Sequence, residues 1–171
     1  TLALLMRVYC LHETNAQRLE LRFQVMSMLA TTLRTTLSLE LVTMVFKSVE
    51  TIAIAMNFLP RDAFSQLYKE VAHANGLAFG TQTPNTLDVD RAARPEITAG
   101  VLMEHLHRCV SNVLAFKPDY SDGLASCGLM EIVILPLLDT KCSISTANMV
   151  KRIDCLQLHL LGLSLLLMFM T

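Results

Sequence analysis

The segment that decides the fold is residues 37–59, LSLELVTMVFKSVETIAIAMNFL, in which apolar side chains cover almost the whole circumference of a helix. Its polar neighbours form one narrow row, namely Thr36, Glu40, Thr43, Lys47, Glu50 and Asn57. A helix that is apolar nearly all round is buried, either among other helices or in a membrane. The charges near its middle would each cost about 2.5 to 3.5 kcal/mol at a bilayer centre. We therefore expect a helix enclosed by protein, and the most enclosed element of the fold.

The composition of the whole chain agrees with a helical core. Of 171 residues, 53% are hydrophobic, 10 are Met and none is Trp, and the mean hydropathy is +0.46. Leu, Met and Ala lose little rotamer freedom in a helix, so a core built from them is typically helical. The length suits one core. The sequence predicts an all-α fold of six or seven helices packed as antiparallel pairs, forming an irregular bundle or a short α-solenoid fragment.

One helix is expected before this segment and another after it. Apolar residues recur at steps of three and four over residues 14–34, at Leu19, Phe23, Met26, Leu29 and Leu33. Thr14 and Gln17 have the spacing of a capping box, which predicts the start of that helix. After Pro60, Asp62 suits the positive end of a second helix that leaves at Asn75 and Gly76.

Three further helical segments are expected after residue 94. Pro95 suits a first helical position, and Pro118 ends that helix. In the next segment, residues 124–138, Pro136 predicts a kink or an end near Leu135. A last helix begins after Ser145 or Thr146, and its polar residues, Gln157, His159, Gly162 and Ser164, are spread around the helix. This last helix therefore has no polar face of its own to present to solvent.

The domain organisation follows from one polar stretch. Residues 77–94 contain Gly, Pro, Thr, Asn and charged residues, which indicates a long loop. Such a loop is either functional or mobile, or it is a disordered connection. We expect a single helical domain over residues 1–171, with two halves, 1–76 and 95–171, joined by this loop.

Charge and cysteine content narrow the class of protein. The 14 basic and 15 acidic residues are scattered, and the longest basic run is Lys151 and Arg152, so the footprint of a nucleic-acid-binding protein is missing. Five cysteines without a CxxC spacing argue against a disulfide framework and for a reducing intracellular compartment, the cytoplasm or nucleus. We expect these cysteines to be buried small hydrophobic residues. Because the chain begins at Thr1 and ends within an apolar run, we expect a piece of a longer protein.

The densest group of potential metal ligands is Glu104-His105-Leu106-His107-Arg108-Cys109. On a helix, His105 and Cys109 share a face, whereas His107 points about 200° away from His105. A metal site would need a ligand from elsewhere, such as His73, and the spacing indicates none. The pattern favours an ion pair between Glu104 and Arg108, and no metal site is expected.

No other motif indicates an enzyme. Residues 123–128, GLASCG, resemble a nucleophile elbow, but Leu124 stands where a glycine is required and no strand precedes it. Cys127 lacks a base nearby in the sequence and is expected to pack in the core. The pairs Asp88/Asp90 and Asp119/Asp122 lack the other features of a calcium loop. The sequence predicts no catalytic residue and no cofactor, and a metal- or thiol-dependent enzyme is the weakest hypothesis.

The function that the sequence favours is a non-enzymatic helical scaffold or adaptor that binds protein partners within a larger assembly. Met-rich and apolar helix faces adapt to partners. The predicted partner-binding residues are Leu156, Leu160, Leu163, Leu167 and Met170 on the last helix, and Met44, Met56 and Phe58 around the second. The alternative is a membrane-associated subunit. Residues 155–171 are uncharged and follow Lys151 and Arg152, although their length is at the lower limit of the ~17 to 25 residues that cross a bilayer.

Overall fold

The computed structural model describes Leu4 and residues 8–34, 36, 38–74, 98–139 and 149–170, with the backbone alone for 149–155. Within these residues the protein is helical and holds no strand, which confirms the all-α fold. The elements are α2 (Glu13–Phe23), α3 (Val25–Thr32), α4 (Leu39–Ala55), α5 (Arg61–Ala74), α7 (Ala99–Phe116), the short 3-10 helix η1 (Pro118–Tyr120), α8 (Ser121–Leu124), η2 (Ala125–Ile134), α9 (Leu135–Asp139) and α10 (Met149–Met168). The loop expected at 77–94 lies outside the described residues.

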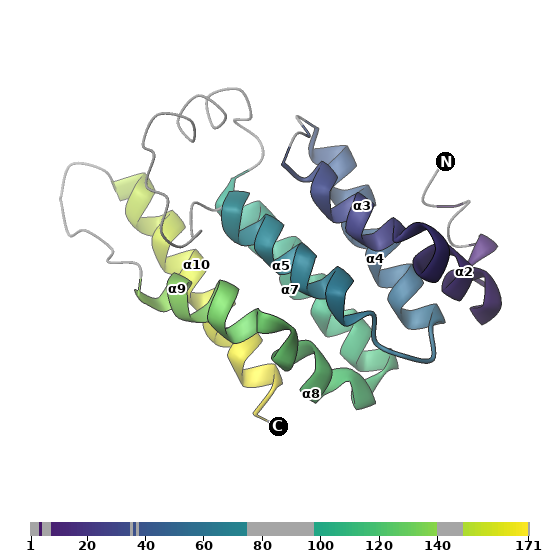
Figure 1. The fold of residues 1–171 in the computed structure, drawn as a ribbon. Coiled ribbons are helices and arrows are strands. Elements are labelled where there is room, and N and C mark those ends of the chain that lie inside the picture. The colour runs from purple at the N-terminus through teal and green to yellow at the C-terminus, as the bar shows by residue number, and fades with distance from the viewer. Residues whose placement is uncertain are drawn as a thin grey trace.

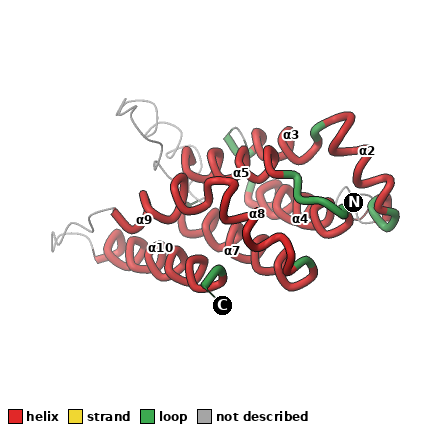
Figure 2. The backbone as a smooth tube through the Cα atoms, turned by 60° about the horizontal axis from the view of Figure 1, so that its bottom comes forward, coloured by secondary structure: helices red, strands yellow, loops and turns green. Residues whose placement is uncertain are grey.

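Most of the helices lie in two layers, and α2 packs on α3 and α4 at one end (Figures 1 and 2). One layer contains α3, α5 and the segment η2–α9, and the other contains α4, α7 and α10. Across the layers, α3 packs on α4, α5 on α7, and η2–α9 on α10. The fold is therefore a stack of three helix pairs, and helices from both sides of the expected loop share one hydrophobic core.

The quoted segment forms α4, in the second layer. The Ser38 side chain caps its N-terminus by accepting the Leu41 N–H at 3.4 Å. Its buried residues include Val42, Val45, Phe46, Val49 and Ile52. The helix ends at Ala55, four residues before the predicted end, because Met56 is extended. The hydroxyl of Tyr120 donates a hydrogen bond of 2.9 Å to the Met56 carbonyl, which satisfies an acceptor at this helix end.

The single helix expected over residues 14–34 is wrong, because the chain breaks at Gln24. Gln24 has a left-handed backbone (φ 48°) and separates α2 from α3. The buried Glu20 carboxylate accepts the Met26 N–H at 2.9 Å and so satisfies a donor in the first turn of α3. The break turns Phe23, expected in the core, out to solvent. The expected capping box is also absent, since Gln17 donates its hydrogen bonds to the side chains of Glu13 and Asn57.

The kink expected at Pro136 occurs eight residues earlier. Gly128 has φ 97° and interrupts η2, whereas Pro136 occupies the second position of α9. The backbone stays helical from η2 into α9, since Leu135 has φ −61° and ψ −46°, so the chain does not break at this proline. Glycine carries the break because the left-handed conformation costs it nothing.

The remaining helix starts follow local signals. Helix α5 begins directly after Pro60, as expected. Helix α7 is capped by Thr98, whose side chain accepts the Val101 N–H at 3.3 Å, and it ends just before Pro118 as predicted. Pro95 and residues 145–148 lie outside the described residues.

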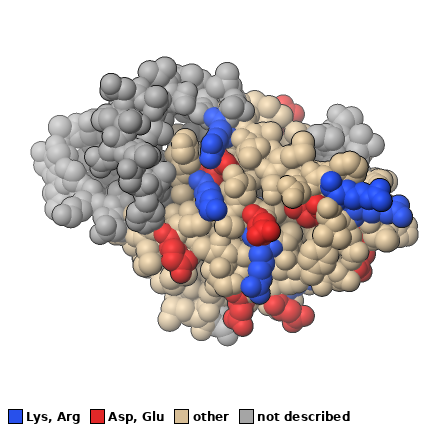
Figure 3. All heavy atoms as spheres, in the orientation of Figure 1, with Lys and Arg blue, Asp and Glu red and all other residues tan. Residues whose placement is uncertain are grey.

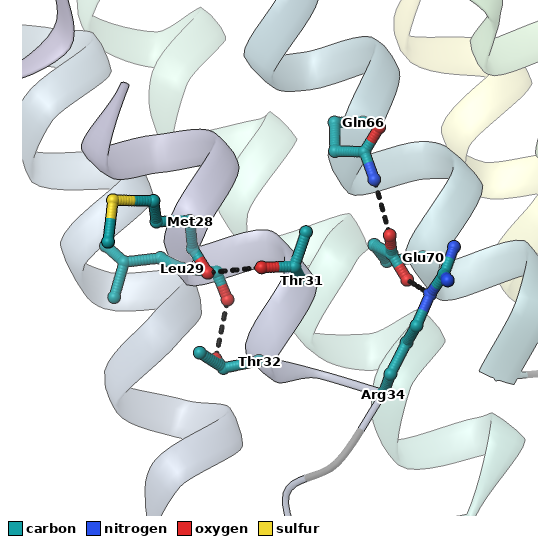
Figure 4. A network of polar contacts seen from close by, with 7 residues as sticks. All are labelled: Met28, Leu29, Thr31, Thr32, Arg34, Gln66 and Glu70. Atoms are coloured by element: carbon teal, nitrogen blue, oxygen red, sulfur yellow. Dashed lines mark hydrogen bonds and ion pairs between the residues drawn. The ribbon is translucent and has the colours of Figure 1, made fainter. Parts of the chain in front are cut away.

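A buried carboxylate holds α3 against α5 (Figure 4). Glu70 on α5 is completely buried, and Arg34, just after α3, pairs with it through Nε. Gln66, one turn earlier on α5, donates to the other oxygen of Glu70. Both oxygens of the carboxylate therefore have a donor, as a buried charge requires.

Candidate protein-interaction surface

The histidines of α7 are hydrogen-bonded to neighbouring helices. His105 Nδ1 donates to the Val101 carbonyl at 2.8 Å, and its Nε2 lies 3.0 Å from the Thr43 hydroxyl on α4. On the other side of α7, His107 Nε2 lies 2.8 Å from the Ser164 hydroxyl on α10. A metal ligand needs a free ring nitrogen, and these contacts already occupy three of the four. They connect α7 to both neighbours in its layer.

The rest of the candidate ligand group does not converge either. Cys109 is buried, Arg108 pairs with Glu104 at 2.8 Å as predicted, and His73 is exposed near the end of α5. Among the described residues, no three His, Cys, Asp or Glu side chains come together to hold a metal ion.

The described thiols are buried and unpaired, as predicted for packing cysteines. Cys10, Cys109 and Cys127 are free and lie in the core. Desolvation raises the pKa of all three thiols, most strongly that of Cys109. A reactive cysteine requires a lowered pKa, so these environments oppose nucleophilic chemistry. Cys142 and the side chain of Cys155 lie outside the described residues.

The inner face of α10 fixes how this helix sits on the fold. Leu165 is completely buried, and Ser164 contacts His107 of α7. Gly162 is buried against α9, where a Cβ at this position would lie 2.8 Å from a methyl group of Leu137. These contacts with two neighbouring helices determine the rotation of α10 about its axis.

The outer face of α10 carries a row of exposed apolar side chains, which we call the α10 seam. It consists of Leu156, Leu160, Leu163, Leu167 and Met170, with exposed fractions from 44% at Leu163 to 73% at Met170. The steps between them are four, three, four and three, the heptad spacing with which one helix packs along another. All five are residues that the sequence analysis assigned to partner binding.

The second predicted group of partner-binding residues is only partly at the surface. Phe58 is exposed and Met44 is half-buried. Met56 is completely buried, which removes it from the predicted surface. The helical pattern of the sequence could not show this, because α4 ends at Ala55 and Met56 is extended, with its carbonyl bound by Tyr120, 64 residues away.

Three of the exposed apolar residues that the sequence analysis missed lie at the other end of the stack. Leu21, Phe23 and Met28, on α2 and α3, are all more than half exposed. Their helix pattern assigned Phe23 to the core, and nothing local signals the break at Gln24. Unlike the α10 seam, α2 also carries Glu13, Arg18, Glu20 and Arg22.

One helical stretch among the described residues is long and apolar enough to cross a membrane, Pro118–Leu138, with 21 residues. It differs from the two segments that the sequence analysis considered, and it is broken by Gly128. Core helices of soluble proteins pass the same test, and this stretch packs against α5 and α10. The C-terminal apolar helix, Leu156–Met168, falls below the required length.

Charged side chains are sparse on the face of the molecule shown in Figure 3, most of which is neither acidic nor basic. The Lys and Arg side chains on this face lie among Asp and Glu side chains.

Comparison with known proteins adds no family to this description: no family model, curated protein or solved structure matches the chain.

Proposed function

We propose that the protein is a non-enzymatic helical scaffold whose α10 seam binds a helix of a protein partner. The observation that carries the proposal is the apolar row on a helix whose rotation is fixed by Gly162, Ser164 and Leu165. A preformed row loses little conformational freedom on binding, so most of its apolar burial contributes to affinity.

The stacking of the helix pairs supports this proposal. In an α-solenoid, each helix pair buries a face against the next, and a terminal pair needs a polar outer face to be soluble. Helix α10 belongs to the last described pair, and its outer face is apolar. An apolar outer face at the end of a helix stack is typical of a surface that another helix covers.

The test is capture from native extract followed by quantitative mass spectrometry. The double variant Leu160→Glu/Leu167→Glu places charge in the α10 seam, and we expect it to lose partners that the unmodified chain retains. Leu21→Glu is the matched control, because Leu21 is 68% exposed and Leu160 is 67% exposed. Point variants are preferable to truncation at Asp154, which would also remove the buried Leu165. Equal retention of every partner by all three chains would contradict the proposal.

Membrane association is the alternative proposal, and the observation that favours it is the uncharged run of α10. An anchored chain would stay with membranes on alkaline extraction, whereas a chain bound to protein would be released.

A further inference from the structure

We propose that the partner of the α10 seam is a second copy of this chain, so that two helix stacks join through α10 in a symmetric dimer. This inference rests on the proposed function of the seam and names its occupant. A two-fold interface uses the same patch on both subunits, so the patch must complement itself.

The spacing of the α10 seam allows it to pack against an identical copy of itself. A heptad row packs against an equivalent row because each side chain inserts between those of the facing helix. The five seam residues are four leucines and one methionine, so two identical rows offer each other side chains of matching size. The seam begins at Leu156 and follows α10 to its end at Met168, and Met170 lies two residues beyond the helix.

The charge of the α10 seam also allows it to pack against an identical copy of itself. No Asp, Glu, Lys or Arg occurs between residues 156 and 170, so two copies can approach without repulsion between like charges. At the opposite end of the stack, the exposed Arg22 lies between the exposed Leu21 and Phe23 in the sequence, so the apolar residues there are interrupted by charge. A contact between the two ends would be heterologous and would lead to open chains of molecules, whereas the α10 contact closes.

The area available sets the strength of the dimer. Covering five side chains of this size on each copy removes on the order of 1,000 Å² in total, which is the lower limit for a specific interface. We therefore expect a reversible dimer that dissociates on dilution.

The experiment is analytical ultracentrifugation of the purified chain over a concentration series. The unmodified chain is expected to pass from monomer to dimer as concentration rises. Leu160→Glu/Leu167→Glu should weaken the dimer by at least about tenfold, because charges would be buried at its centre. Leu21→Glu should dimerise like the unmodified chain, and circular dichroism of all three chains checks that the helices are intact.

Several results would overturn the inference. The unmodified chain could remain monomeric at every concentration, or the dimer could survive the double substitution. Equal loss in Leu21→Glu would indicate head-to-tail contact. A monomer that floats with phosphatidylcholine vesicles would indicate lipid as the occupant. If the unmodified chain is monomeric and the seam variant still loses extract partners, the proposed function stands and the second copy is wrong.

Discussion

At the scale of single residues, two positions set local requirements that few substitutions can meet, the buried Glu70 and the left-handed Gly128. Both oxygens of the buried Glu70 carboxylate accept hydrogen bonds, one from Arg34 and one from Gln66 (Figure 4). Gly128 allows η2 to turn because it has no Cβ, and an added Cβ would lie 2.6 Å from a methyl group of Ile132. A substitution at either site should therefore lower the free energy of unfolding.

Replacing Arg34 by alanine should lower the free energy of unfolding by about 2 kcal/mol, because it leaves the Glu70 carboxylate buried without its cation. The figure is below that for a fully buried pair, since the Arg34 side chain is 52% exposed. Urea unfolding followed by circular dichroism measures the change. Arg108→Ala, which breaks the exposed pair with Glu104, is the control and should cost about 0.5 kcal/mol or less. Equal losses in the two variants would show that burial of Glu70 is unimportant.

Replacing Gly128 by alanine should cost about 1 to 2 kcal/mol, because an L-residue is strained in the left-handed conformation. Gly100→Ala is the matched control, since Gly100 is helical and an added Cβ there meets only ordinary contacts of 3.7 Å or more. We expect the control to be neutral or stabilising. Thermal unfolding of both variants decides the point, and a neutral Gly128→Ala would mean that the kink is absent in solution.

At the scale of elements, α10 is apolar on two sides, one of which packs in the fold while the other is exposed. The side with Leu165 is packed against its own fold, and the α10 seam is open to solvent. The side chains of the α10 seam stay exposed when the single chain folds. Substitutions on the packed side should therefore change the free energy of unfolding, whereas substitutions in the seam should change association.

Truncating Leu165 to alanine should reduce the free energy of unfolding by about 2 to 5 kcal/mol, because it leaves a cavity in the core. Leu167→Ala, two residues along the same helix, should change it by about 0.5 kcal/mol or less when measured on the dilute monomer. Chemical unfolding at low concentration separates the two effects. Similar losses would show that α10 is rotated from the position described.

The element scale also shows where sequence reasoning succeeds. The boundaries of α5 and α7 follow from Pro60 and Pro118, whose effect on the backbone is local. At the break at Gln24, the buried Glu20 accepts the Met26 N–H, and at the end of α4 the Met56 carbonyl accepts from Tyr120, far along the chain. The seam residues were predicted because α10 has more apolar side chains than one packed face can cover. Which of its sides faces the core depends on close contacts at Gly162 and Ser164, and no local pattern encodes these.

At the scale of the whole molecule, the helix pairs share one hydrophobic core, and polar contacts join α7 to α4 and α10. Helix α7 contacts α4 through His105 and through Asn112, which donates to Glu50 at 3.0 Å, and it contacts α10 through His107. Of these contacts, the one at His107 is sensitive to acid, because desolvation lowers the pKa of this histidine below its usual 6.5.

Stability should therefore fall as the solution is acidified from neutral pH. With a lower pKa in the folded state, the unfolded chain binds the His107 proton more readily, so stability is lost as pH falls from 6.5 through the folded pKa. Glu20 acts in the opposite sense at more acidic pH, since desolvation raises its pKa above 4.5. Urea midpoints of the unmodified chain and His107→Gln, above and below pH 6.5, check this. The variant should lose part of the dependence, and an unchanged slope would contradict the assignment.

The absence of Asp, Glu, Lys and Arg from residues 156–170 has a consequence for solution conditions. Salt screens interactions between charges, so raising the concentration of sodium chloride should leave self-association through the α10 seam unchanged. Sulfate, which is excluded from protein surfaces, strengthens apolar burial and should promote self-association. Cooling reduces the driving force for apolar burial, so dimers formed at room temperature should separate in the cold. Sedimentation at two temperatures would show this, and dimers that persist equally well in the cold would point to a different kind of contact.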